Sequence, residues 1–164
     1  MNGETDILFL ILTSHGSPDG LAVTAGRRTE VLTPSTLAEM LNQTGVRHKV
    51  VIISACYSGG WVGPLASNTT LVMTAADADH TSYGCGRLSE LTYFGHAFLV
   101  DALNRTEDFG AAFAQARDEI AQWETEEEYE HSYPEIASTP AIERQLARWR
   151  KQLHAGFPLP FRPA

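Results

Sequence analysis

Cysteine is scarce in this sequence, because Cys56 and Cys85 are the only two among 164 residues. A single pair in a chain of this length is not the disulfide framework that small secreted domains require. We therefore expect both thiols to be reduced and the fold to depend on a hydrophobic core.

The sequence also lacks a long hydrophobic run and an excess of basic residues. Its longest apolar run, ILFLILT, is too short to span a bilayer, and no signal-peptide pattern is present. Twelve lysines and arginines against 20 aspartates and glutamates give a net charge of −8, which disfavours binding to a phosphate backbone. These absences predict a soluble chain that does not bind nucleic acid.

What the sequence does contain is an alternation of apolar runs and helix signals. Thr33 followed by Pro34 predicts a helix start, and this helix is expected to run to about Thr44, before Gly45. Continuous runs of apolar, β-favouring residues predict buried strands over residues 6–13, 48–55 and 70–75. Other expected elements are a hairpin over 21–32, helices over 91–104, 109–128 and 141–153, and a short strand over 134–139.

This alternation predicts an α/β fold, in which helices cover both faces of a mostly parallel sheet. We expect residues 1–164 to form one domain, since 43% of them are hydrophobic and 20% charged. Residues 77–90 are predicted to be a loop, and the charge run Glu124–Glu130 a solvated, fraying helix end. The last residues, FPLPFRP, are expected to be extended.

Two short motifs follow predicted strands. His15 in LTSHGSPDG follows the first strand, and Cys56 in VVIISACYSGG follows the second. Ligands bind at the carboxyl ends of parallel strands, so both side chains are expected at one crevice. A thiol beside an imidazole suits nucleophilic catalysis, and the small residues Ser58, Gly59 and Gly60 let backbone amides approach a bound oxygen.

Other kinds of site are less well supported. His80 and Cys85 lack the third and fourth partners of a zinc site, so no metal is expected. The sequence has no phosphate-binding glycine loop, and YSGGW does not match a serine nucleophile elbow. No cofactor is therefore predicted.

Together, the two strand-end motifs resemble the signature segments of legumain-like cysteine peptidases, the asparaginyl endopeptidases of peptidase family C13. The stretches MTAADADHTSYGCG and TYFGHAF are also similar to that family, so the resemblance covers most of residues 6–103. It implies a caspase-like three-layer sandwich. It also implies that His15 is the catalytic imidazole, that Cys56 is the nucleophile, and that the amides of Gly16 and Cys56 form the oxyanion hole.

The resemblance further implies a substrate pocket that departs from the family. Enzymes of this kind that cleave after asparagine have acidic residues where this chain has Ser54 and His96. Ser82 and Tyr83 are expected to line the same pocket by resemblance. Without the two carboxylates, we predict a relaxed or altered preference rather than strict cleavage after asparagine.

A second departure concerns the N-terminal part of the fold. In caspase-like folds the histidine strand is the third of the sheet, whereas only five residues, MNGET, precede residues 6–13 here. The domain is therefore expected to be incomplete at its N-terminus, with an exposed sheet edge through which copies self-associate. Two functions follow: a cysteine endopeptidase acting on peptides, or a non-catalytic or truncated module that binds proteins or needs a partner chain to complete its sheet.

Overall fold

The structure of the protein is a computed structural model that describes residues 2–84 and 91–156. Three expectations concern residues outside these ranges: the reduced state of Cys85, the second half of the predicted 77–90 loop, and the extended conformation of the last residues.

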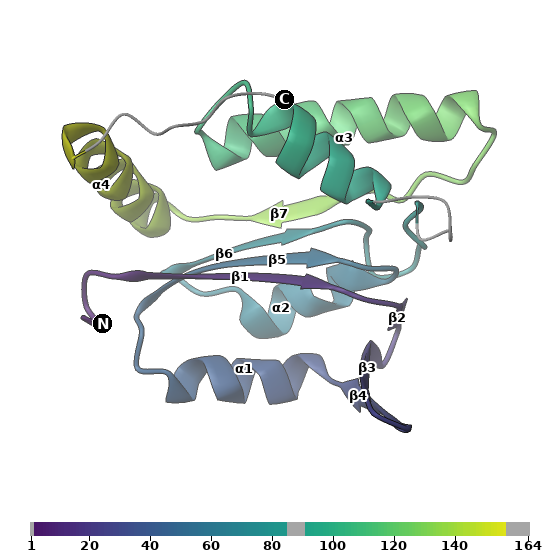
Figure 1. Ribbon diagram of the computed structural model, residues 1–164, viewed down its shortest axis with the longest axis horizontal. Coiled ribbons are helices and arrows are strands. Elements are labelled where there is room, and N and C mark those ends of the chain that lie inside the picture. The colour runs from purple at the N-terminus through teal and green to yellow at the C-terminus, as the bar shows by residue number, and fades with distance from the viewer. Residues whose placement is uncertain (1, 85–90, 157–164) are drawn as a thin grey trace.

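The central sheet has four strands in the order β1 (Ile7–Thr13), β5 (His48–Ser54), β6 (Thr70–Thr74) and β7 (Glu135–Ala137). The first three strands are parallel, and β7 runs antiparallel to β6. The first three had been predicted from continuous apolar runs, and β7 was expected as a short strand over 134–139 but is shorter than that. Figure 1 shows the sheet edge-on, with helices above and below it.

The continuous apolar sequence of β5 reflects burial on both of its faces. Val50 and Ile52 belong to one core cluster, whereas Val51 and Ile53 belong to the other. Because side chains alternate between the two faces of a strand, a strand covered on both sides needs apolar residues at every position. This explains why no polar residue interrupts VVII.

Helices form the two outer layers of the sandwich (Figure 1). On one face lie α1 (Pro34–Gln43) and the short α2 (Val62–Leu65). On the other face lie η2 (Gly95–Ala102), α3 (Phe109–Glu126) and α4 (Pro140–Gly156). The structure thus confirms the predicted three-layer α/β fold with a mostly parallel sheet.

The start of α1 follows the prediction. Thr33 is its N-cap, with the side-chain oxygen accepting a hydrogen bond from the Thr36 amide at 3.2 Å, and Pro34 is the first helical residue. Gly45, two residues beyond the helix, has a φ of +68°, a conformation that glycine adopts without strain. Hydroxyl cap, proline and glycine therefore set both ends of this helix.

The segment predicted as a helix over 91–104 is instead a π-helix over a shorter range, Gly95–Ala102. The amide of Leu103 donates to the carbonyl of Phe98, five residues back, at 3.0 Å. Apolar spacing does not distinguish such a turn from an α-helix, because both bury one side. Single π-turns are frequent at functional sites.

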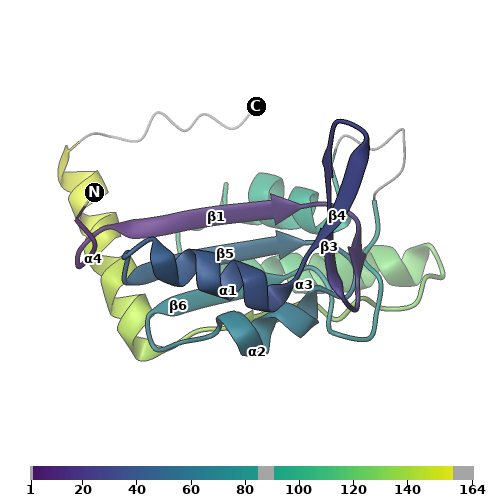
Figure 2. The same cartoon turned by 90° about the horizontal axis from the view of Figure 1, so that it is seen from below.

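A small second sheet stands at the carboxyl end of β1. It contains β2 (Gly16–Ser17) and the predicted hairpin, formed by β3 (Gly20–Ala25) and β4 (Arg28–Leu32), whose turn includes Gly26 at a φ of +64°. The two-residue strand β2 was not predicted. Figure 2 shows this hairpin standing across the end of the central sheet.

Strand β1 forms one edge of the central sheet. Within residues 2–84 and 91–156 it pairs with β5 and has no strand on its other side. Phe9 and Ile11 are 38% and 51% exposed on this strand. An apolar edge of this length is unusual in a soluble protein.

Among the residues that the structure describes, no helix is long and apolar enough to cross a membrane.

Candidate active site

The register between β1 and β5 determines where the two candidate catalytic residues lie. Thr13, the last residue of β1, pairs with Ser54, the last residue of β5. His15 and Cys56 each follow two residues later. They therefore lie at equivalent positions beyond the carboxyl ends of the two strands.

Gly16 makes the closest approach between the two segments. A Cβ atom built at Gly16 would overlap the carbonyl oxygen of Cys56, so residue 16 must be glycine for the backbones to meet. The amide of Ala22 donates to the carbonyl of His15 at 2.9 Å, which places Gly16 at a non-hydrogen-bonded position of the β2–β3 ladder. The Gly16 amide is therefore directed away from β3.

The backbone turns sharply immediately after Cys56. Tyr57 has a φ of +57°, which is rare for a residue with a side chain, and its amide donates to the carbonyl of His80 at 2.8 Å. Strained residues of this kind are concentrated at active sites. In the described part of the chain, the Cys56 amide has no hydrogen-bond acceptor, so it is available to a bound oxygen.

The Cys56 thiol is half-buried and contacts Ser82. Its sulfur lies 3.4 Å from the amide nitrogen and 3.5 Å from the carbonyl oxygen of Ser82, and 3.8 Å from the hydroxyl. The imidazole of His15 is exposed and forms no hydrogen bond with the residues described. The structure thus brings the backbones of Gly16 and Cys56 together, while the thiol itself is held by Ser82.

The small residues after Cys56 pack against the chain that follows β6. The Ser58 hydroxyl accepts a hydrogen bond from the Ala76 amide at 3.1 Å, and a Cβ at Gly59 would overlap the backbone of Asp77 and Ala78. The Gly60 amide donates to the Tyr57 carbonyl at 3.3 Å within the short 3₁₀ turn η1 (Ser58–Trp61). Gly60 is therefore not free to bind a substrate oxygen, contrary to the sequence-based expectation.

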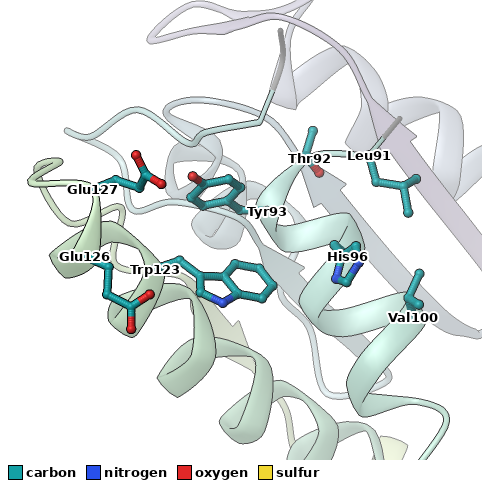
Figure 3. Close-up of a pocket in the computed structure, with 8 residues that line it drawn as sticks. All are labelled: Leu91, Thr92, Tyr93, His96, Val100, Trp123, Glu126 and Glu127. Carbon is teal, nitrogen blue, oxygen red and sulfur yellow. The ribbon is translucent and has the colours of Figure 1, made fainter. Parts of the chain in front are cut away.

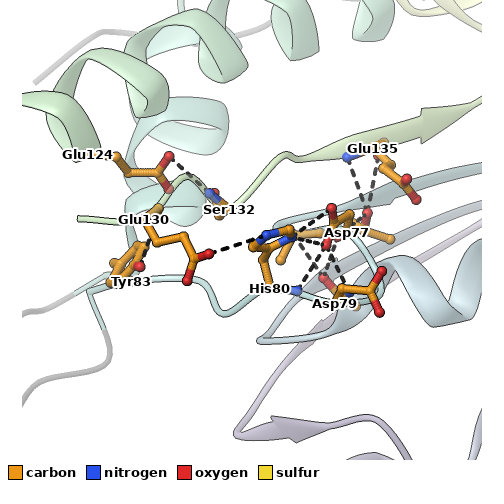
Figure 4. A network of polar contacts seen from close by, with 11 residues as sticks. Asp77, Asp79, His80, Tyr83, Glu124, Glu130, Ser132 and Glu135 are labelled. Atoms are coloured by element: carbon orange, nitrogen blue, oxygen red, sulfur yellow. Dashed lines mark hydrogen bonds and ion pairs between the residues drawn. The ribbon is translucent and has the colours of Figure 1, made fainter.

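Asp77 and His80 anchor the segment that carries Ser82 (Figure 4). The His80 Nδ1 atom lies 2.7 Å from an Asp77 carboxylate oxygen, and Glu130 lies 3.6 Å from Nε2. The hydrogen bond to Asp77 raises the pKa of His80; burial opposes this effect, and the nearby carboxylates reinforce it. Burial would raise the pKa of Asp77, but the bonds from the His80 ring and two backbone amides lower it overall.

The four predicted pocket residues lie on three segments: Ser54 at the end of β5, Ser82 and Tyr83 in the loop after β6, and His96 in η2. The Ser54 hydroxyl is 2.7 Å from that of Thr92, at the start of the segment that leads into η2. Tyr83 stacks on Tyr129 with ring centroids 4.6 Å apart, and its carbonyl accepts the Tyr93 amide at 3.0 Å. Ser82 contacts the thiol, as described above. Hydrogen bonds of Ser54, Ser82 and Tyr83 therefore connect the residues around Cys56 to the segment that leads into η2.

His96 lines a cavity of about 560 Å³ between η2 and the end of α3 (Figure 3). Its Nδ1 atom is 2.7 Å from the Asp101 carboxylate, and its ring meets Trp123 edge-on with centroids 5.7 Å apart. Trp123 packs against the core and also lines this cavity.

The charge run Glu124–Glu130 is not simply a solvated helix end, as the sequence had suggested. Glu124 is only 1% exposed, and its carboxylate accepts the Ser132 amide at 3.1 Å. Glu126 and Glu127 line the cavity beside His96 (Figure 3). The sequence gives one indication of this arrangement, since Trp123 directly precedes the run and Tyr129 lies within it.

Metal binding finds no support in the part of the chain that the structure describes, where no three His, Cys, Asp or Glu side chains are grouped to hold an ion. The geometry instead joins a histidine segment, a cysteine segment with a strained turn, and an adjoining cavity. In a comparison with known protein families, the sequence model of the peptidase C13 family matches residues 1–141.

The chain belongs to the peptidase C13 family. This match covers most of the chain and confirms the resemblance to legumain-like peptidases. No curated protein matches the sequence. Family membership supports a cysteine peptidase in general and agrees with the α/β sandwich.

We expect Gly16→Ala to disturb the meeting of the histidine and cysteine segments. The added methyl group overlaps the Cys56 carbonyl, so one segment must move, at a cost of about 1–3 kcal/mol of unfolding free energy. Urea denaturation measures this cost. The matched control is Gly63→Ala in α2, where a Cβ meets nothing within 4 Å and stability should stay equal or rise. Equal stability of Gly16→Ala and the wild type would contradict the close contact.

We also expect the Asp77–His80 pair to stabilise the fold in a pH-dependent way. His80 with a raised pKa contributes stability below its ordinary value of about 6.5, and this contribution is lost as pH rises through the raised pKa. Asp77 with a lowered pKa contributes above about 3.9, and this contribution is lost as pH falls through the lowered pKa.

The stability difference between the wild type and His80→Gln should therefore be largest near pH 5 and smaller at pH 9, as measured by urea denaturation. In an Asp77→Asn background the same substitution should show little pH dependence, because the partner charge is gone. A difference that stays constant from pH 5 to pH 9 would show that the pair is not ionised as described.

Proposed function

We propose that this chain hydrolyses peptide bonds with Cys56 as nucleophile and His15 as general acid and base. One observation carries the proposal: the Thr13–Ser54 register and the Gly16–Cys56 contact bring the two strand ends together. A family of cysteine peptidases supplies the matching chemistry.

The reaction begins when the Cys56 thiol gives its proton to His15 and the sulfur attacks the peptide carbonyl carbon. The new C–S bond produces a tetrahedral oxyanion. Collapse of this intermediate breaks the C–N bond, and the protonated imidazole gives its proton to the leaving amine. His15 then takes a proton from a water molecule whose oxygen attacks the thioester carbon. The C–S bond breaks to release the carboxylic acid, and the imidazolium returns its proton to the sulfur, which restores the free thiol.

The amides of Gly16 and Cys56 are the proposed oxyanion donors. The Gly16 amide is directed away from β3, and the Cys56 amide is unpaired within the described ranges. Both donors belong to backbone that is already fixed by strand pairing and by the Tyr57 turn. Donors held in place before the reaction stabilise the developing charge without reorganisation.

The position of His15 is consistent with this role in a free enzyme. Its ring is exposed at the edge and forms no hydrogen bond within the described residues, so it can rotate toward the sulfur when a substrate binds. Catalytic hydrogen bonds are often long in the absence of substrate and shorten in the complex. The Ser82 contacts meanwhile hold the sulfur at the strand end.

An electrophilic peptide probe, a peptidyl chloromethyl ketone, tests this assignment. We expect it to label Cys56, so Cys56→Ala should abolish labelling and Cys85→Ala should leave it unchanged. His15→Ala should slow labelling by about 10²–10⁴-fold, the usual loss of a general acid–base group. Intact-protein and peptide mass spectrometry identify the labelled thiol. Equal labelling of both cysteines, at a rate that does not depend on His15, would contradict the assignment of Cys56 and His15 as the catalytic pair.

The open edge of β1 favours a second candidate function. This strand has one neighbour in the described structure, and Phe9 and Ile11 are exposed on it. A module that binds a protein, or that completes its sheet with another chain, would use such an edge. We propose a second copy of the chain as the simplest partner, paired through β1.

Light scattering over a range of concentrations tests this self-association. We expect the mass of the wild type to exceed that of a monomer and to rise with concentration. Ile11→Lys should yield a monomer, because it puts a charge on the pairing edge. Val23→Lys is the matched control, since Val23 is similarly exposed but lies on the hairpin. A wild type that stays monomeric at every concentration would contradict the proposal.

A further inference from the structure

The cavity between η2 and the end of α3 has a composition that points to a particular kind of substrate side chain. Its volume of about 560 Å³ lies within the range of small-molecule sites. Apolar and aromatic side chains from Leu91, Tyr93, Val100 and Trp123 form its walls, and Glu126 and Glu127 supply carboxylates at one side (Figure 3).

The cavity is connected to the proposed nucleophile by short contacts. The hydroxyl of Thr92, which lines it, is 2.7 Å from the hydroxyl of Ser54, and Ser54 is two residues before Cys56. The amide of Tyr93, which also lines it, donates to the carbonyl of Tyr83, and Tyr83 directly follows the Ser82 that holds the thiol. A peptide bound at Cys56 therefore has this cavity beside it.

Two aromatic rings in the cavity are arranged to receive a cation. Tyr93 and Trp123 meet edge-on, with centroids 5.4 Å apart and an interplanar angle of 77°, so each ring has at least one face that the other does not cover. A guanidinium or ammonium group is attracted to such a face within about 6 Å of the ring centroid. Indole is the most favourable ring for this contact.

The surrounding charge is negative. Neither Glu126 nor Glu127 forms an ion pair with any residue in the described ranges, and Glu126 accepts only a neutral bond from Gln122, at 2.8 Å. Both residues stand at the C-terminal end of α3, where the helix dipole is negative and no basic side chain occupies the last turn. Burial first, and then Glu127 and other negative groups, raise the pKa of Tyr93.

We propose that this cavity binds a basic side chain, preferably arginine, of the peptide substrate. This inference rests on the proposed peptidase function. An acidic side chain would be repelled by the two carboxylates, and an asparagine is too short to use the aromatic walls and the carboxylates together. Arginine is favoured over lysine because its planar guanidinium stacks on a ring while its N–H groups bond to carboxylates.

Hydrolysis of a peptide series tests the inference. The peptides are identical except for the residue before the scissile bond, which is arginine, lysine, citrulline, asparagine or glutamate. Citrulline is the sharpest comparison, because it has nearly the shape of arginine without the charge. We expect kcat/KM to be highest for arginine, at least about fivefold lower for citrulline, and lowest for glutamate.

Substitutions in the cavity should remove this preference. Glu126→Gln and Glu127→Gln should each lower kcat/KM for the arginine peptide by up to about fivefold, with little effect on citrulline. Trp123→Leu should lower it by about twofold to thirtyfold, and Trp123→Phe, which keeps an aromatic face, by less. Glu39→Gln on α1 is the control for net charge, because it lies on the opposite face of the sheet.

Binding to the Cys56→Ala protein separates this inference from the proposed activity. Calorimetric titration with the arginine and citrulline peptides should show tighter binding of arginine, and Glu126→Gln and Glu127→Gln should reduce the difference. If peptides are cleaved with no preference for arginine, the cavity assignment is wrong and the peptidase function stands. If no peptide is cleaved but arginine binding depends on Glu126 and Glu127, the peptidase function is wrong and the cavity assignment stands. If there is neither cleavage nor selective binding of arginine, both proposals are wrong.

Discussion

The parallel pairing of β1 with β5 is the constraint on which the candidate site depends. Because side chains alternate along a strand, a shift of one residue in this register would send the core side of β1 to the opposite face. Leu8, Leu10 and Leu12 face one core cluster, and Ile7 packs against the other, so burial on both sides opposes such a shift. The register that aligns the ends of β1 and β5, which His15 and Cys56 follow, is therefore favoured by packing of the strand.

Glycine at two positions then allows the strand ends to close. Gly16 lets its backbone touch the Cys56 carbonyl, and Gly59 lets the chain after β6 lie against the turn that follows the cysteine. The Tyr57 amide bonds to His80, whose ring is held by Asp77. Thus the cysteine turn is fixed from both sides by backbone contacts, and the thiol meets Ser82 from the second of these segments.

The sequence predicted the elements whose signals are local. Continuous apolar runs gave the three parallel strands, and Thr33–Pro34 gave the start of α1, because burial on two faces and capping depend on neighbouring residues. Local patterns could not predict the π-turn of η2, since its apolar spacing also fits an α-helix. Nor could they show that Glu124 is buried, because its partner is the amide of Ser132 in the following loop.

The candidate site likewise has parts that local sequence signals predict and parts that depend on tertiary packing. The carboxyl ends of parallel strands lie at the same end of a sheet, so the strand-end motifs alone predicted His15 and Cys56 at one crevice, whereas the role of Gly16 came from the family resemblance. The cavity could not be predicted in this way, because it forms where the segment 91–100 packs against the end of α3, and local patterns do not show how these segments pack together. This division has a physical consequence. The proposed chemistry depends on backbone fixed by strand pairing, whereas the proposed selectivity depends on side chains of η2 and α3. Substitutions at these helix positions can therefore change the preferred substrate without moving the strand ends that carry the thiol.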